Sequence, residues 1–438
     1  MNLPFVLRGI DSGREYDPRE IRYRGEDGEL LEVVHSKTGR PVSRKTLQER
    51  RMSHDPIDVS GVWRYRELVL PLPYRHIIVK PEGNTNLYPA GSLENSGYNR
   101  IGRYAGVENL YLKHEGENPT GSFKDRGMTA GISMAHYLGA TAVACASTGN
   151  TSASLASYAA QAGMKCFVFI PAGKISYSKL AQAIAYGAVT IQIDGDFDAA
   201  MQLVEEVCIS LKVYLLNSVN PFRIEGQKTI GIELIHQLNW DVPDWIVLPG
   251  GNLGNTAALG KGLSELFQRG YISRLPRVAT IQAHGASPFY RSFKSGFSEF
   301  TPMQANTIAS AIRIGNPVSY KKAKQTIEFT NGLVETVTDA EIMDAKAVID
   351  RAGIGCEPAS ATTLAGIRKL QNAGTIRKSD RVAAILTGHV LKDPAAIADF
   401  HEGKLPGTDP VLRNTVQHAQ PTLASVREII TRVLNDTV

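Results

Sequence analysis

The sequence predicts an α/β fold in which parallel sheets are covered by helices on both faces. From about residue 105 onward, short runs of β-branched and small apolar residues alternate with Ala-rich segments of helical periodicity. Strands and helices that alternate in this way form βα units, whose strands run parallel. No internal repeat or low-complexity tract interrupts the pattern, and no run of about 18 apolar residues predicts a bilayer-spanning helix.

The individual elements follow in chain order. Residues 141–147 (TAVACAS) predict a buried strand, residues 151–162 a helix that ends at Gly163, and residues 165–171 (KCFVFIP) the next strand. Further strands are expected at 189–194, 213–218, 245–249, 278–282 and 382–387. The first 60 residues are polar, rich in Arg and Glu and weakly periodic, so they predict no clear element.

Composition narrows the functional class. A chain of 438 residues with 43% apolar and 21% charged residues is typical of a globular protein of two or three domains. A net charge of +5 without a basic run argues against a dedicated nucleic-acid or membrane-surface protein. We expect neither a secretory signal nor a transit peptide, because the apolar stretch at residues 3–7 is too short and acidic residues follow it. We therefore expect a soluble cytoplasmic protein, in keeping with four widely separated cysteines, Cys145, Cys166, Cys208 and Cys356.

Three turns rich in Gly, Asn and Ser follow predicted strands, at residues 147–152 (STGNTS), 250–255 (GGNLGN) and 387–389 (TGH). Ligands of open α/β sheets bind beyond the carboxyl ends of the strands, so we expect these turns on one rim. Successive glycines and the free N–H groups of a helix starting at Thr256 can hold a phosphate, although a tight turn is the simpler alternative. STGNTS suits a carboxylate or phosphate, or is merely a helix N-cap.

Lys124 lies in ENPTGSFKDRGM (117–128), near the expected start of a helix. The positive end of the helix field disfavours the protonated amine, and the neutral amine is the form that condenses with a carbonyl. Taken alone, a solvated lysine beside Asp125 and Arg126 is the simpler interpretation. In NSVNPFRIEGQKT (217–229), Arg223 can fork onto an anion, with a surface ion pair as the simpler alternative.

Together these segments resemble the fold-type-II enzymes that use pyridoxal 5′-phosphate, and within them the threonine synthase family. The resemblance covers about residues 55–395 in the family's order, and SGVWRYRE, NSVNPFRIEGQKT and AIRIGNPVS are the segments specific to threonine synthases. A mild departure is Asn86, where the family usually has Pro. The matching segments are SGVWRYRE (60–67), EGNTNLY (82–88), ENPTGSFKDRGM, STGNTSAS, NSVNPFRIEGQKT, PGGNLGN, TIASAIRIGNPVS (307–319), GCEPASATTLAG (355–366) and LTGH.

The resemblance implies a tryptophan synthase β-like architecture of two domains, each with a parallel sheet, and a small N-terminal segment. We expect residues 1–50 to form a degenerate zinc-ribbon-like segment and residues 421–438 a C-terminal helix. Residues 51–110 and 218–420 would form the large cofactor-binding domain, and residues 111–217 the small domain. A homodimer is implied in the same way.

The resemblance also implies the site. Lys124 would be the Schiff-base lysine and later the proton carrier, with Phe123 preceding it at the cofactor. Asn150 would bond the ring oxygen of pyridoxal phosphate, and Thr387 would face its pyridine nitrogen. The cofactor phosphate would lie in a cradle of Gly250, Gly251, Asn252, Leu253, Gly254 and Asn255. The substrate's carboxylate and phosphate would contact Ser147, Thr148, Asn150 and Thr151, and the phosphate site would be completed by Asn217, Ser218, Arg223 and Asn252.

The activity implied is that of a lyase that converts O-phospho-L-homoserine and water to L-threonine and phosphate. One alternative is a serine/threonine dehydratase, which needs no second phosphate site and is disfavoured by Asn217, Ser218 and Arg223. Another is a relative such as cysteate synthase, which the threonine-synthase-specific segments disfavour. A binding protein of a different class is disfavoured by the intact Lys124.

The N-terminus departs from the resemblance. Many threonine synthases of this branch begin with a zinc ribbon of four cysteines, whereas this chain places Gly9, Ser12, Gly25 and Gly28 at those positions. None offers a thiolate or imidazole, so we expect no structural zinc. We expect the segment to pack onto the rest of the protein through Leu7, Ile10, Tyr16, Leu30, Leu31 and Val33.

Overall fold

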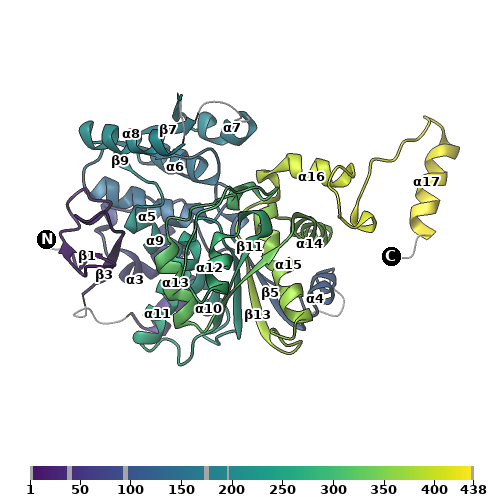
Figure 1. Ribbon diagram of the computed structural model, residues 1–438, viewed down its shortest axis with the longest axis horizontal. Helices are drawn as coiled ribbons and strands as arrows, with labels where there is room; N and C mark the ends of the chain where they lie inside the picture. The colour runs from purple at the N-terminus through teal and green to yellow at the C-terminus, as the bar shows by residue number, and fades with distance from the viewer. Residues whose placement is uncertain (1–2, 37–41, 92–96, 172–176, 195–196, 436–438) are drawn as a thin grey trace.

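The computed structural model describes residues 3–36, 42–91, 97–171, 177–194 and 197–435. Within these residues the chain forms three sheets, which are a six-stranded sheet of order β12–β11–β10–β13–β5–β4, a four-stranded sheet of order β8–β7–β6–β9, and a three-stranded N-terminal sheet (Figure 1). All pairs in the two larger sheets run parallel except β4 with β5. The α/β fold with two parallel-sheet parts is confirmed.

The six-stranded sheet separates two hydrophobic cores. Successive side chains of a strand point to opposite faces, and in β10 Ile246 and Leu248 enter one core while Trp245 and Val247 enter the other. Burial on both faces explains why this strand is a continuous apolar run. The strands are β4 (Leu87–Pro89), β5 (Asn109–His114), β10 (Trp245–Pro249), β11 (Arg277–Ala283), β12 (Leu333–Val337) and β13 (Arg381–Leu386).

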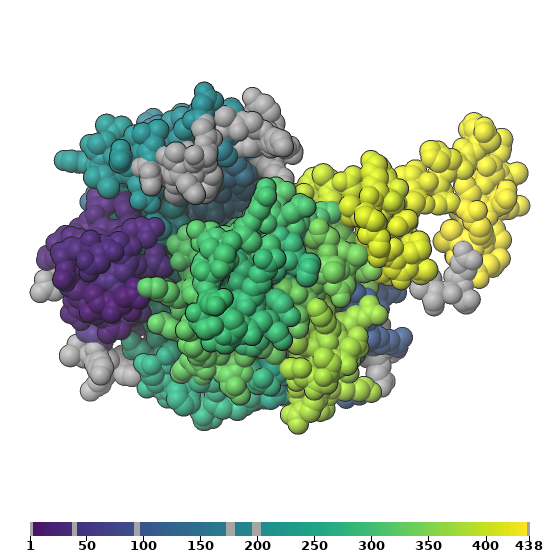
Figure 2. Space-filling model, viewed as in Figure 1, coloured from purple at the N-terminus to yellow at the C-terminus, as the bar shows by residue number. Residues whose placement is uncertain are grey.

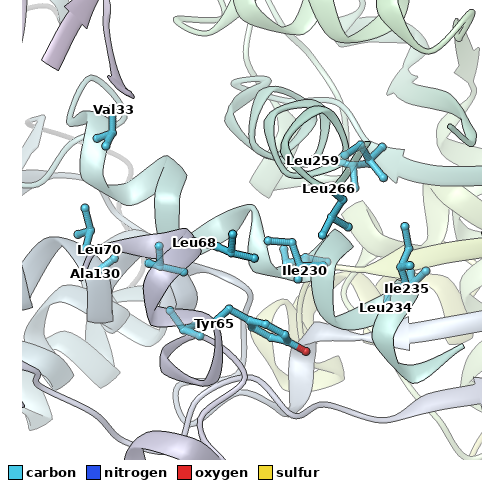
Figure 3. Packing of buried hydrophobic residues seen from close by; sticks show 14 of the residues in the cluster. Val33, Tyr65, Leu68, Leu70, Ala130, Ile230, Leu234, Ile235, Leu259 and Leu266 are labelled. Atoms are coloured by element: carbon cyan, nitrogen blue, oxygen red, sulfur yellow. The ribbon is translucent and has the colours of Figure 1, made fainter. Parts of the chain in front are cut away.

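Helices cover both faces of this sheet. Side chains from distant segments meet in one of the two cores, where Ile230, Leu259 and Leu266 lie close to Leu68 (Figure 3). The helices around this sheet are α4 (Asn99–Ala105), α10 (Thr229–Gln237), α11 (Gly254–Gln268), α12 (Pro288–Lys294), α13 (Tyr320–Phe329), α14 (Asp339–Arg351) and α15 (Pro358–Asn372). Short helices α1 (Arg44–Arg51), α2 (Pro56–Val59) and α3 (Arg66–Val69) precede them in the chain.

The four-stranded sheet confirms the strands expected at 141–147, 165–171 and 189–194. The strand expected at 213–218 is only two residues long, because Asn220 caps the following helix and turns the chain away from the sheet. The strands are β6 (Ala142–Ala146), β7 (Lys165–Pro171), β8 (Val189–Ile193) and β9 (Tyr214–Leu215). The helices of this part are α5 (Lys124–Tyr137), α6 (Asn150–Gln161), α7 (Tyr177–Ala185) and α8 (Phe197–Ser210). The next helix, α9 (Pro221–Gln227), packs against α5 and α11.

Two sequence-based expectations need correction. The expected boundary between residues 110 and 111 falls inside β5, which pairs with β13 in the six-stranded sheet. The three candidate loops do not follow strands of one sheet, because the turn at 147–152 follows β6 in the smaller sheet and the other two follow β10 and β13. The site is therefore built between two sheets.

The N-terminal sheet is antiparallel, with order β2–β1–β3, and Figure 2 shows this segment seated against the rest of the protein. Alternate side chains enter the large core, where Phe5 meets Phe222 of α9 edge-on with ring centroids 6.4 Å apart. Of the expected docking residues, Leu30 packs on the smaller sheet and Ile10 is half-buried. The core does contain Leu7, Tyr16, Leu31 and Val33. The strands are β1 (Phe5–Gly9), β2 (Glu15–Tyr16) and β3 (Leu31–His35).

A carboxylate lies between the two N-terminal loops. Glu29 accepts hydrogen bonds from the backbone N–H groups of Asp11 (2.6 Å) and Ser12 (3.0 Å), and from the Ser12 hydroxyl. A Cβ added at Gly9 would lie 2.2 Å from Glu29 Oε1, and one added at Gly25 would lie 2.7 Å from Glu29 Cγ. Three of the four positions where a zinc ribbon places cysteines therefore surround the Glu29 side chain. The Ser12 hydroxyl and these amides lower the pKa of Glu29.

We expect Glu29→Gln to loosen the N-terminal sheet, because an amide NH₂ in place of one carboxylate oxygen would face donors. A carboxyl whose pKa is lowered by folding stabilises the fold fully above its ordinary pKa of about 4.3, and the contribution is lost as pH falls from that value through the lowered pKa. The measurement is limited proteolysis of residues 3–36 between pH 7 and about pH 3. The exposed Glu26→Gln is the matched control, and equal cleavage rates for the two variants would contradict the assignment.

At the other end of the chain, α16 (Pro394–His401) leads through an extended segment to α17 (Leu423–Asn435), which stands apart from the rest of the protein (Figures 1 and 2). Five of its large apolar residues are exposed, namely Leu423, Val426, Ile430, Val433 and Leu434. Among the described residues, no helix has both the length and the apolar character needed to cross a membrane.

Candidate active site

Lys124 is brought next to the turn at 387–389 by backbone pairing. The Phe123 N–H donates to the carbonyl oxygen of Thr387 (3.0 Å), and the His389 N–H donates to that of Gly121 (2.9 Å). The two segments run antiparallel, with a bridge between Ser122 and Gly388. Because α5 begins at Lys124, this pairing holds the first residue of the helix against the end of β13.

The environment of Lys124 favours a neutral amine. The side chain is half-buried, its Nζ lies 4.5 Å from the centroid of the Phe123 ring, and it forms no ion pair in the described part of the chain. The adjacent Asp125 is turned away and accepts hydrogen bonds from Thr120 and Ser154. Burial, and secondarily the positive charge of Arg223, lower the pKa of Lys124 to about 7. The simpler interpretation of a solvated lysine is wrong.

Asn150 and Thr387 both donate to one carboxylate, that of Glu357. Asn150 begins α6, after a strand of the smaller sheet, and Thr387 follows β13 of the larger sheet. Asn150 Nδ2 donates to Glu357 Oε2 (3.0 Å), and the Thr387 hydroxyl donates to Glu357 Oε1 (3.2 Å). Burial raises the pKa of Glu357. Sequence reasoning assigned no role to Glu357, although it lies in the matched segment GCEPASATTLAG. Its position before a proline at a helix start is typical of an N-cap, yet its side chain makes no capping hydrogen bond.

The Gly-rich turn at 250–255 leads into α11, which begins at Gly254, two residues earlier than expected. A Cβ added at Gly250 would lie 2.6 Å from Thr280 Cγ2, so the turn is tightly packed on its sheet side. At Gly254 the nearest atoms to an added Cβ are 3.8 Å away, and Leu253 adopts a left-handed conformation with φ of 62°. The turn is therefore closed on its sheet side and open at Gly254, where the first N–H groups of α11 have no partner within the helix and can bind a phosphate.

Asn252 joins this turn to the segment after β9. Its Nδ2 donates to the Ser218 hydroxyl (2.8 Å), and its Oδ1 accepts from the Val318 N–H (2.7 Å). Asn217 accepts from the Ala146 N–H (2.8 Å) through its Oδ1, which places it beside the end of β6. Asn252 of the expected phosphate cradle is thus in direct contact with Ser218 of the expected substrate site.

Arg223 is a buried cation without an anionic partner in the described residues. It lies on α9, which packs against both α5 and α11, and its side chain is 2% exposed. Nη1 donates to the carbonyl oxygen of Leu216 (3.2 Å), while Nε has no hydrogen-bond partner. Burial lowers the pKa of Arg223 to about 10. A buried charge of this kind is costly unless a bound anion compensates it, so the expected surface ion pair is wrong.

The turn at 147–152 faces open space on one side. A Cβ added at Gly149 would meet no atom within 4 Å, and Thr148 and Thr151 are half-buried there. The Ser147 hydroxyl accepts a long hydrogen bond from the Gly149 N–H (3.4 Å). The role of this turn in binding the substrate's carboxylate stays a prediction.

Unpartnered buried polar atoms indicate that these residues fit pyridoxal phosphate. In the described chain, Asn255 Oδ1 and Nδ2, Ser122 Oγ and Arg223 Nε are buried and make no hydrogen bond. Buried polar groups in native proteins are normally satisfied, and phosphate oxygens satisfy such donors. Lys124 would hold the carbonyl carbon of the cofactor, Asn150 and Thr387 its ring, and the turn at 250–255 its phosphate.

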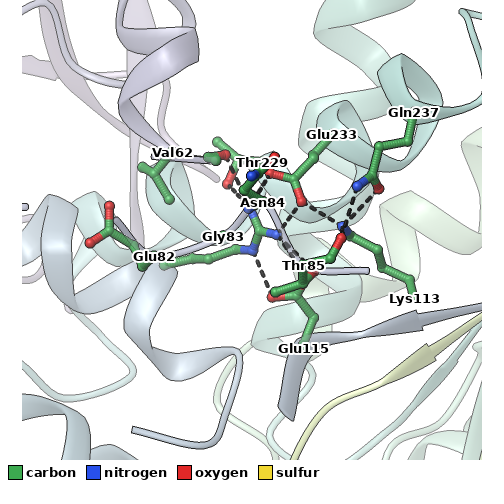
Figure 4. Close-up of polar contacts among 12 residues, drawn as sticks. Val62, Glu82, Gly83, Asn84, Thr85, Lys113, Glu115, Thr229, Glu233 and Gln237 are labelled. Carbon is green, nitrogen blue, oxygen red and sulfur yellow. Dashed lines mark hydrogen bonds and ion pairs between the residues drawn. The ribbon is translucent and has the colours of Figure 1, made fainter. Parts of the chain in front are cut away.

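A buried charge network, which the sequence analysis did not anticipate, anchors α5 (Figure 4). Arg126 donates to Glu115 (2.6 Å) and to Glu233 (2.8 Å), and Lys113 of β5 donates to Glu233 (2.5 Å). All four side chains are fully buried. The network ties α5 to β5 and α10 and so fixes the helix that starts at Lys124.

The described residues contain one cluster with metal-ligand spacing, formed by His35, Glu225 and Glu265. Lys228 donates to both carboxylates, and Lys261 donates to Glu225. Ammonium groups thus occupy the positions that a cation would take. The cluster is an ion-pair network between β3, α9 and α11.

Comparisons with known proteins identify the relatives of this chain. Residues 78–388 match the model of the family described as pyridoxal-phosphate dependent enzyme. The threonine synthase of Methanocaldococcus jannaschii is 46% identical over 89% of this chain and 94% of its own. That of Methanosarcina acetivorans is 45% identical over 91% and 95%. The crystal structure of threonine synthase from Escherichia coli shares the fold, with a TM-score of 0.65 at 17% identity over 98% of this chain and 100% of that one.

Proposed function

Since this chain belongs to the pyridoxal-phosphate dependent enzymes, and among them to the threonine synthases, we propose that it converts O-phospho-L-homoserine and water to L-threonine and phosphate. The observation that carries the proposal is the pairing of two groups. Lys124, whose pKa is lowered to about 7, lies near enough to the buried guanidinium of Arg223 for that charge to affect it, and no carboxylate in the described residues compensates this guanidinium. The first suits a carbonyl cofactor, and the second suits a substrate that brings its own phosphate.

The cofactor, when bound, supplies an electron sink for the carbon atoms of the substrate. Lys124 moves protons, because its neutral amine lies at the fixed start of α5 and can take a proton and return it. The bond between the γ carbon and the phosphate oxygen breaks, a proton leaves the β carbon, and a proton is added at the γ carbon. The oxygen of water then bonds to the β carbon while its proton goes to the released phosphate, and the proton removed from the α carbon is returned there. Arg223, with Asn217 and Ser218 at the end of β9, holds the phosphate before it leaves.

A phosphate site beside the amine distinguishes this reaction from its nearest alternative. A serine/threonine dehydratase acts on substrates without a phosphate, and a buried Arg223 would then stay uncompensated in every step. A cysteate-synthase-like enzyme would accept phosphoserine and sulfite, so it shares the phosphate but differs in the nucleophile and in the length of the substrate.

The test is release of inorganic phosphate from O-phospho-L-homoserine, with L-threonine identified by chromatography. The comparison substrates are O-phospho-L-serine with sulfite, L-serine and L-threonine. We expect O-phospho-L-homoserine to give phosphate and threonine in equal amounts. The comparison substrates should react much more slowly. Faster turnover of phosphoserine with sulfite, or of unphosphorylated serine, would contradict the proposal.

The pH dependence of cofactor uptake provides a separate prediction. An amine reacts with a carbonyl in its neutral form, so the rate at which the apoenzyme takes up pyridoxal phosphate should rise with pH through about 7 and level off above it. The rate is followed by the absorbance of the bound cofactor. Nα-acetyl-lysine, whose amine has an ordinary pKa of about 10.4, is the reference and should still gain rate above pH 9. A protein profile that keeps rising beyond pH 9 would contradict the lowered pKa.

We further propose that the enzyme acts in the cytoplasm as a homodimer. The four cysteines are buried and free, which suits a reducing compartment. Light scattering on a size-exclusion column gives the mass in solution, and a mass of one chain would remove the dimer from the proposal.

A further inference from the structure

Glu357 is a buried carboxylate between two side chains that come from different sheets. It is 4% exposed, and its two oxygens accept from Asn150 Nδ2 and from the Thr387 hydroxyl. Its backbone N–H donates to the Gly388 carbonyl oxygen (3.0 Å). A Cβ added at Gly388 would lie 2.3 Å from Glu357 Cδ, so the carboxylate rests directly against the backbone of the turn that carries Thr387.

Thr387 Oγ1 also lies 3.1 Å from Ser360 Oγ, and either hydroxyl can donate in that hydrogen bond. Ser360 Oγ accepts from the Gly388 N–H (3.0 Å), so Ser360 contacts the same turn. Glu357 and Ser360 together fix the position of the Thr387 side chain. Asn150 uses one of its two amide protons on Glu357, which fixes the orientation of the amide group.

Lys124 and Lys392 are the positive groups near the carboxylate and favour its charged form, but neither forms an ion pair with it in the described residues. Lys392 instead donates to Gln182 (2.6 Å). The hydrogen bonds of Glu357 therefore go to the two side chains of the candidate cofactor site.

We propose that Glu357 is a positioning residue for pyridoxal phosphate, which orients the Asn150 amide and the Thr387 hydroxyl toward the cofactor ring. The inference rests on the proposed function, because it takes these two residues as cofactor ligands. Glu357 acts on the cofactor only through Asn150 and Thr387. Its loss should therefore weaken binding of pyridoxal phosphate while the apoenzyme stays folded.

The test uses Glu357→Gln, which keeps the size of the side chain. With its carbonyl oxygen toward Asn150, the new amide presents its NH₂ to Thr387 and reverses that hydrogen bond. We expect the dissociation constant for pyridoxal phosphate, measured by fluorescence titration of the apoenzyme, to rise about tenfold, the effect of one lost charge-assisted hydrogen bond. The matched control is Glu117→Gln, an exposed carboxylate that bonds Asn86 and Tyr88.

A double-mutant cycle separates positioning from a structural role. In a Thr387→Val background, which lacks the hydroxyl, Glu357→Gln should change the dissociation constant by less than about twofold, because coupled residues are not additive. The same tenfold loss in both backgrounds, or no loss in the native one, would overturn the inference. The thermal midpoint of the apoenzyme confirms that each variant is folded. If the native protein itself does not bind pyridoxal phosphate, the proposed function fails, whereas normal binding and turnover with an unaffected Glu357→Gln variant removes only the role of Glu357.

Discussion

Replacing Lys124 with alanine should abolish turnover while pyridoxal phosphate is still bound. A positioned proton carrier contributes up to about 10⁴-fold to the rate, and the loss of the attachment point adds to this. The turn at 250–255 and the start of α11 remain, so the cofactor phosphate keeps its contacts. The variant is examined for threonine formation and, separately, for the absorbance of bound cofactor after dialysis. Residual turnover within about 10²-fold of the native enzyme would contradict the role of Lys124.

The attachment point can be identified directly. Borohydride reduction of the native enzyme should link pyridoxal phosphate to the peptide that contains Lys124, as found by mass spectrometry. Lys392 provides an internal control, because it is a second half-buried lysine near Glu357, with a lowered pKa caused by burial. Label on the Lys392 peptide would show that Lys392, and not Lys124, is the attachment point.

Replacing Arg223 with alanine should reduce kcat/KM for O-phosphohomoserine strongly. The loss of one partner of a buried charge pair costs on the order of 2–5 kcal/mol, or roughly 30- to 4000-fold. Slow deamination of serine should change little, since serine carries no phosphate. Arg223→Lys keeps the charge but loses the planar fork, so it should recover only part of the activity. The exposed Arg291→Ala is the control.

Stability separates a binding role of Arg223 from a structural one. Because no carboxylate in the described residues compensates this guanidinium, replacing it with the apolar Arg223→Met should leave the thermal midpoint of the apoenzyme unchanged or raise it. Equal losses of activity on phosphorylated and unphosphorylated substrates, together with a lowered midpoint, would show that Arg223 is structural.

Strands with unbroken apolar runs were predictable from the sequence. Residues 165–171 and 245–249 form β7 and β10 with the expected bounds. Every residue of β10 is buried, whereas in β7 buried residues alternate with partly exposed ones. β5 was not expected, since it carries Lys113 and His114 in its second half. Lys113 is tolerated there because it forms a buried ion pair with Glu233 of α10, which is 120 residues away in the sequence. A pattern along one strand contains no information about such a distant partner.

In the candidate site, too, some residues were predictable from the sequence and others depend on contacts between distant segments. The resemblance gave Lys124, Asn150 and Thr387, and local sequence gave the helix start at Lys124. Glu357 was missed because its function depends on the meeting of two sheets, which places Asn150 of α6 and Thr387 after β13 on either side of it. The charge of Arg223 was visible, but its isolation from carboxylates could be recognised only in three dimensions.

The Glu29 carboxylate has a consequence for the conditions under which the N-terminal sheet holds together. Thiolates around a metal are opened by chelators and by oxidation of sulfur, and they depend on the supply of the ion. The contacts of Glu29 with the Ser12 hydroxyl and two backbone amides involve no thiolate that an oxidant or a chelator could act on. We expect the N-terminal sheet to assemble as the chain is synthesised, independent of metal delivery, and to keep its contacts with α9 under oxidative stress.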